Sequence, residues 1–121
     1  MILFLQLCKI LIMILKLNLP QRIICSMAVG NIEKGSIIDW RIKKEAKEIL
    51  GLGDAEYKEY DITEEDGVIR WKNKEEAEKE KEYDIPQRAY ELLVAHFKEM
   101  DGKKSFPSSE YAETAAKLLE V

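Results

Sequence analysis

The segment from Ser36 to Gly51, SIIDWRIKKEAKEILG, constrains the fold more than any other part of this sequence. Ser36 and Asp39 have the spacing of a helix capping box, and Gly51 stands where the helix is expected to end. Between these ends, apolar residues recur at helical intervals: Ile38, Ile42, Ala46, Ile49 and Leu50. The pattern predicts an amphipathic helix that buries this stripe. Its opposite face carries Arg41, Lys43, Lys44 and Lys47.

Three further long helices are predicted from similar signals. In the first of them, Asn18 and Gln21 form a capping box around Pro20. In the last, Ser108 is expected to cap the first turn. One or two helical turns are also expected after Asp54, whose side chain can cap them. The long helices are expected at residues 18–30, about 86–100 and 108–119.

Strand signals lie between the helices. The stretch YDITEEDGVIRWK has an Asp66-Gly67 turn between β-prone residues and predicts a hairpin near residues 59–72. The segments LKLNLPQRII and KEYDIPQRAY each join an alternating strand to a capped helix, so the strands ending at Leu19 and Ile85 are expected to pair. The charge run NKEEAEKEKE after the hairpin can be a solvated loop, a frayed helix or the start of another strand, and a solvated loop is expected.

These elements predict an α+β fold of about four helices with a small antiparallel sheet. The N-terminal half has a winged-helix-like order of helix, helix, short helix and hairpin. A chain of 121 residues can enclose one modest core, which predicts one domain. The 46% hydrophobic and 35% charged residues suit a globular domain with strongly charged exposed faces.

The N-terminal stretch MILFLQLCKILIMILKLNLPQ raises a separate question. Gln6, Lys9 and Lys16 interrupt it, and a central lysine costs about 2.5–3.5 kcal/mol in a membrane-spanning helix. A secretion signal needs a charged region before the apolar one and a small-residue cleavage site after it, and this stretch has neither. Two alternatives stay open: an appended amphipathic helix, or a start site assigned too early with Met13 as the natural start. Residues 1–12 are therefore treated as a doubtful extension and residues 13–121 as the domain.

Charge is unevenly distributed along the chain. Residues 1–53 carry 8 basic and 4 acidic side chains, whereas residues 54–84 carry 6 basic and 13 acidic ones. This asymmetry gives the molecule a charge dipole that can orient self-association or attract a partner with a basic patch. Cys8 and Cys25 lie in apolar surroundings without metal-type spacing, which predicts reduced thiols in the cytosol.

The sequence offers little catalytic chemistry. His96 and Glu99 have a spacing that can share a metal, but the sequence supplies no second ligand cluster to complete such a site. The glycine segments GNIEKGS and GLGD do not have the form of a phosphate-binding loop. No serine stands in a nucleophile elbow, and Cys25 is expected on an apolar helix face. We therefore expect no enzyme activity, no cofactor and no metal.

The winged-helix-like order makes a DNA-binding transcriptional regulator the alternative function. Its charge is unfavourable, because the short helix and the hairpin fall in the acidic region 54–84 and repel phosphate. Only the second helix, with Arg41, Lys43, Lys44 and Lys47, has the charge to face a DNA backbone, and a solvated helix face is the alternative role of these residues.

Protein binding is the remaining class of function. Trp40 and Trp71 are either core residues or interface anchors, because tryptophan is enriched at the centres of protein interfaces. An exposed Trp40 would favour a partner protein or a second copy of this chain. The predicted interaction surface consists of Trp40, Arg41, Lys44, Lys47 and Trp71.

From about Met13 onward, the chain resembles small bacteriophage and prophage proteins of unassigned function. The likeness lies in the order of LNLPQRII, GNIEKGS and GLGDAEYKEYDITEEDGVIRWK, followed by two closing helices. The resemblance implies a cytoplasmic accessory protein that binds and modulates a host or phage protein. It implies no functional residues.

Overall fold

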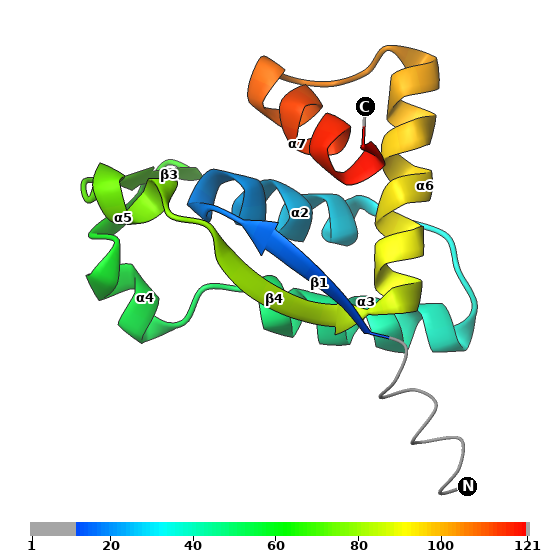
Figure 1. The fold of residues 1–121 in the computed structure, drawn as a ribbon, viewed down its shortest axis with the longest axis horizontal. Helices are drawn as coiled ribbons and strands as arrows, with labels where there is room; N and C mark the ends of the chain where they lie inside the picture. The colour runs from blue at the N-terminus through cyan, green and yellow to red at the C-terminus, as the bar shows by residue number, and fades with distance from the viewer. Residues whose placement is uncertain (1–11, 121) are drawn as a thin grey trace, which may run out of the picture.

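The computed structural model describes residues 12–120, whose arrangement is shown in Figure 1. Helices combine with two separate two-stranded antiparallel sheets, which confirms the predicted α+β class. The doubtful extension lies outside the described residues except for Ile12, which begins the first strand. In chain order the elements are β1 (Ile12–Leu17), α2 (Leu19–Asn31), α3 (Ile37–Leu50), α4 (Asp54–Glu59), β2 (Ile62–Glu65), β3 (Val68–Trp71), α5 (Lys74–Glu78), β4 (Lys81–Pro86), α6 (Gln87–Lys103) and α7 (Ser109–Leu119).

Two predicted capping boxes begin the first two long helices. The backbone N–H of Gln21 donates to Asn18 Oδ1 at 3.0 Å, and the N–H of Asn18 donates to Gln21 Oε1 at 3.0 Å. At α3, the N–H of Asp39 donates to Ser36 Oγ at 3.1 Å, and the N–H of Ser36 donates to Asp39 Oδ2 at 3.2 Å. Each box satisfies two of the backbone donors that a helix start leaves without partners.

β1 and β4 pair in an antiparallel ribbon, as the repeated strand-to-helix segments predict. Ile12 lies opposite Pro86, so the ribbon begins beside the start of α6. Leu15, Leu17 and Ile85 are buried on its inner face. The alternation of side chains along a strand therefore directs one face of this ribbon into the protein.

The two strand-to-helix junctions differ in detail from the prediction. Leu19 is the first residue of α2 and not the end of a strand. Asp84, the residue of KEYDIPQRAY in position to cap the following helix, does not cap α6. It lies in β4 opposite Ile14 of β1, because the ribbon continues to Pro86. Pro86 takes the N-cap position without a side-chain hydrogen bond. The helix expected at about residues 86–100 also runs further: α6 reaches Lys103 and ends where Lys104 adopts a left-handed conformation.

The main core lies between the inner face of the ribbon and the helices α2, α3, α6 and α7. Phe97 of α6 meets Tyr111 of α7 edge to face, with 5.9 Å between ring centres. Cys25 of α2 is fully buried, as expected for a residue on an apolar helix face. Burial raises its pKa to about 12, which keeps the thiol protonated at neutral pH.

A second, smaller cluster holds the hairpin end of the molecule. Its buried side chains are Leu19, Tyr60, Ile62 and Ala77. The expected solvated loop after the hairpin is wrong in part, because residues 74–78 form the short helix α5 and Ala77 anchors it in this cluster.

The turns around this cluster show one confirmation and one correction. Asp66 and Gly67 both have positive φ, 53° and 77°, as the predicted tight hairpin turn requires. At the start of α4, Gly53 takes the N-cap position that was expected for Asp54. Asp54 is instead the first helical residue, where its charge is favourable.

Arg22 joins the two clusters. Its guanidinium is almost completely buried, and its Nε donates to the Leu50 carbonyl at 2.8 Å. The other nitrogens bind Glu56 and the Gly51 carbonyl, and the guanidinium carbon lies 5.0 Å from the centre of the Tyr83 ring. Arg22 thus ties α2 to the end of α3, to α4 and to β4.

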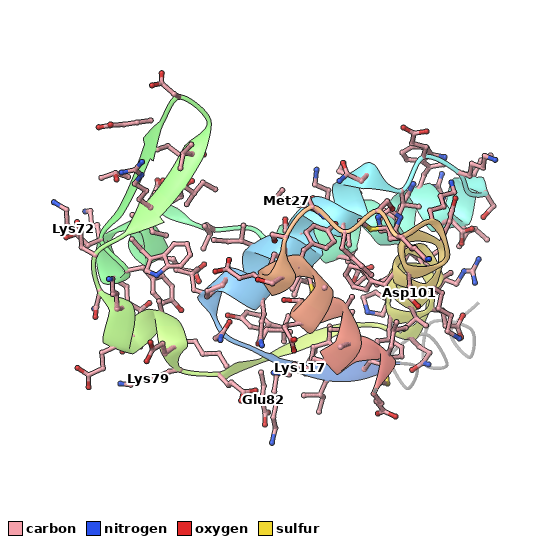
Figure 2. All side chains as sticks on the ribbon, turned by 90° about the horizontal axis from the view of Figure 1, so that it is seen from above. Met27, Lys72, Lys79, Glu82, Asp101 and Lys117 are labelled. Carbon is pink, nitrogen blue, oxygen red and sulfur yellow. The ribbon has the colours of Figure 1, made fainter. Side chains whose placement is uncertain are left out.

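The winged-helix-like order of α2, α3, α4 and the β2–β3 hairpin is present. The hairpin forms a sheet of its own, however, while β1 pairs with β4. Figure 2 shows the hairpin (green) projecting from the rest of the molecule, at the opposite end from the start of α3 (cyan). Within residues 12–120, no helix is long and apolar enough to cross a membrane.

Candidate functional site

The first two turns of α3 reverse the usual pattern of burial. Ile37, Ile38 and Trp40 are 74%, 62% and 52% exposed, whereas Asp39 and Lys43 are buried. The prediction that Ile38 belongs to the buried stripe is therefore wrong. Later in the helix the stripe is confirmed, since Ala46 and Leu50 are buried and Ile42 and Ile49 pack against the main core.

The buried Asp39 fixes the start of α3 against α6. Arg88 donates to both of its carboxylate oxygens, from Nε at 2.9 Å and from Nη2 at 3.2 Å. These bonds, together with the backbone N–H of Ser36, lower the pKa of Asp39 to about 2. The helix is therefore held with Asp39 inward, and its neighbours Ile38 and Trp40 turn toward solvent.

The buried Lys43 fixes the Trp40 side chain. Its ammonium donates to the Ile32 carbonyl at 2.7 Å and lies 3.4 Å from the centre of the Trp40 ring. A cation over an aromatic face is attracted by the ring quadrupole. One face of the indole is thus covered from within the molecule, while half of the side chain stays exposed. The result is an exposed tryptophan with a fixed orientation.

Basic side chains surround these apolar residues. Arg41, Lys44 and Lys47 are exposed, and within residues 12–120 none of them takes part in an ion pair. A hollow of about 360 Å³ lies beside Trp40, and its lining includes Lys44, Lys47 and the acidic Glu48. We call the following residues the α3 surface: Ile37, Ile38, Trp40, Arg41, Lys44 and Lys47.

Four of the five residues predicted for an interaction surface come together on α3: Trp40, Arg41, Lys44 and Lys47. Trp71 does not join them. It lies on β3, is half buried, and packs against the second cluster. Sequence reasoning missed the exposure of Ile37 and Ile38.

The described residues supply little catalytic geometry. His96 lies beside a second hollow of about 370 Å³, and burial lowers its pKa. Its Nε2 is buried without a hydrogen-bond partner in the described part of the chain. Between residues 12 and 120, no group of three or more histidine, cysteine, aspartate or glutamate side chains is placed to hold a metal ion.

Acidic residues dominate the elements that would contact DNA in a winged-helix arrangement. α4 reads DAEYKE, and the β2–β3 hairpin carries Glu64, Glu65 and Asp66, all exposed. Phosphate groups are repelled by such a surface. The start of α3 (cyan) lies at the other end of the molecule from the hairpin (Figure 2), whereas the end of α3 is followed closely along the chain by α4.

Comparison of the chain with protein-family models, curated proteins and solved structures found no match. The α3 surface therefore has to be interpreted from its own chemistry.

Proposed function

We propose that this chain is a small accessory protein without catalytic activity that binds and modulates another protein through the α3 surface. The resemblance of the sequence supports placing it in a bacteriophage or prophage and its partner in the host cytoplasm. The observation that carries the proposal of binding is the reversed burial in α3, with Asp39 and Lys43 inside and Ile37, Ile38 and Trp40 outside.

Burial energetics support this proposal. Removing an isoleucine side chain fully from water is worth about 1.5–3 kcal/mol, so two exposed isoleucines are costly to leave in solvent. A tryptophan adds a large contact area and is enriched among residues that dominate binding energy. Because Lys43 holds the Trp40 ring, less side-chain freedom is lost when a partner covers it.

The charge of the α3 surface indicates the chemistry of the partner. Arg41, Lys44 and Lys47 place three positive charges around the apolar residues, and the exposed Glu45 and Glu48 on the same helix face reduce the sum to one positive charge. An acidic surface with an exposed apolar side chain is the complementary partner. Charges at the edge of a binding surface mainly accelerate association and make the association rate sensitive to salt.

The test is affinity capture from cells that encode the protein, comparing the native chain with Ile38→Glu. Glutamate in the first turn of a helix is favourable, so this variant removes apolar surface without weakening α3. Ile14→Thr is the matched control, because Ile14 is similarly exposed but lies on β1. We expect a specific protein that is recovered with the native chain and the control, and at least about tenfold less with Ile38→Glu. Equal recovery with all three chains would contradict the proposal.

DNA binding is the second candidate, and the exposed Arg41, Lys44 and Lys47 are the observation in its favour. A mobility-shift assay with duplex DNA at low salt distinguishes it from protein binding. Retardation by the native chain that Lys44→Glu removes would favour DNA. No retardation would leave protein binding as the only proposal.

A further inference from the structure

Two ends of the molecule have complementary surfaces. The α3 surface is apolar and carries three bases, with the exposed acids Glu45 and Glu48 beside them on the same helix. The tip of the β2–β3 hairpin is acidic and carries one half-exposed aliphatic side chain, Val68. We call Glu64, Glu65, Asp66 and Val68 the hairpin tip.

The acids of the hairpin tip are as free of partners as the bases of the α3 surface. Within residues 12–120, Glu64, Glu65 and Asp66 take part in no ion pair, whereas other acids of the same acidic region, such as Glu59 and Glu76, pair with lysines. An internal contact between the two ends is excluded by the fold, since the hairpin projects away from α3 (Figure 2). A second molecule can bring them together.

One of the two surfaces projects and the other contains a hollow. The hairpin is a narrow projection with the Asp66-Gly67 turn at its end. The α3 surface has the hollow of about 360 Å³ beside Trp40, with Lys44 and Lys47 in its lining. The face of the hairpin that carries Val68 and Glu65, which pair across the two strands, can enter this hollow and bring Glu65 next to the lysines.

We propose that the α3 surface also binds the hairpin tip of a second copy of this chain. This inference goes beyond the proposed function, in which the same surface binds another protein. The contact is head to tail, so every oligomer keeps one free α3 surface and one free hairpin tip and the association does not close on itself. A hairpin tip covers less than the roughly 1,600 Å² of a stable interface, so the association is weak and reversible.

Sedimentation equilibrium of the full chain tests the inference. We expect a concentration-dependent rise in mean mass up to about 1 mM protein, reduced about tenfold in association constant by about 0.5 M salt. Two double variants, Lys44→Glu with Lys47→Glu and Glu64→Lys with Glu65→Lys, should each stay monomeric because their two ends repel. All four positions are exposed, so both variants are expected to fold, which circular dichroism checks.

A mixture of the two double variants is the decisive sample. In the mixture, the acidic α3 surface of one variant meets the basic hairpin tip of the other, so association should return to within about tenfold of the native constant. A matched charge reversal on α6, Lys98→Glu, should leave self-association unchanged. A mixture that stays monomeric would overturn the inference, and so would a native chain that is monomeric at about 1 mM. The proposed function would survive either result, because capture of another protein tests it separately.

Discussion

The ammonium of Lys43 lies 3.4 Å from the centre of the Trp40 ring and donates to the Ile32 carbonyl at 2.7 Å. Lys43 is only 4% exposed, so this contact is made largely out of solvent. The same lysine therefore stabilises the loop before α3 and orients the tryptophan that we place at the centre of the α3 surface.

Lys43→Met should destabilise the fold by about 1–3 kcal/mol, because the Ile32 carbonyl loses its buried donor while the aliphatic stem is kept. Urea unfolding followed by circular dichroism measures this. Lys44→Met, one residue further on the exposed face, should change the free energy of unfolding by no more than about 0.5 kcal/mol. Equal losses for the two variants would contradict the role given to Lys43.

Arg22→Met should destabilise the protein by about 3–5 kcal/mol. The variant leaves the Leu50 and Gly51 carbonyls and the Glu56 carboxylate without the guanidinium that binds them. Urea unfolding again gives the free energy. Arg70→Met on the exposed side of the hairpin is the control and should be nearly neutral. A loss below about 1 kcal/mol for Arg22→Met would show that the two clusters do not depend on this residue.

Low pH should weaken the ion pair between Asp39 of α3 and Arg88 of α6. Asp39 has a folded pKa of about 2, below the value of about 3.9 expected in the unfolded chain. The stability that it contributes is therefore fully present above about pH 4 and is lost as the pH falls toward 2. At pH 6, Asp39→Asn should unfold at a lower urea concentration than the native chain. The difference between the two urea midpoints should become smaller below about pH 4. A difference that is constant from pH 6 to pH 3 would contradict this.

Alanine substitutions at two glycines should change the stability of the fold in opposite directions. Gly67 has a φ of +77° in the hairpin turn, so Gly67→Ala should cost about 1–2 kcal/mol. Gly102 lies inside α6 with no neighbouring atom within 4 Å of an added Cβ, so Gly102→Ala should stabilise the chain by about 0.5–1 kcal/mol. Thermal melts of the two variants measure the difference. A stabilising Gly67→Ala would show that the turn is not the one described.

The features that sequence reasoning predicted correctly are local ones. The capping boxes at Asn18 and Ser36 use residues three positions apart, and the hairpin turn uses the adjacent Asp66 and Gly67. One long-range prediction was also correct, namely the pairing of β1 with β4, and it came from a segment that the sequence repeats.

The features that it missed depend on distant partners. Ile38 fits a helical stripe, but the orientation of α3 is set by Asp39 binding Arg88, 49 residues away. The sequence around Asp39 and Arg88 contains no pattern that indicates an ion pair between them. For the same reason, Trp40, Arg41 and Lys44 could be named as surface candidates, whereas the exposure of Ile37 beside them followed only from the fold.

Site-specific photo-crosslinking tests the central claim most directly. A photoreactive amino acid replaces Ile37 in the α3 surface, and in a second chain it replaces the exposed Glu113 of α7, a helix that lies across the molecule from α3 (Figure 1). After irradiation in cells that encode the protein, mass spectrometry identifies the attached proteins. We expect one discrete protein adduct from position 37 that is missing from position 113. The same adducts at both positions, or none at position 37, would contradict the claim that the α3 surface binds a protein.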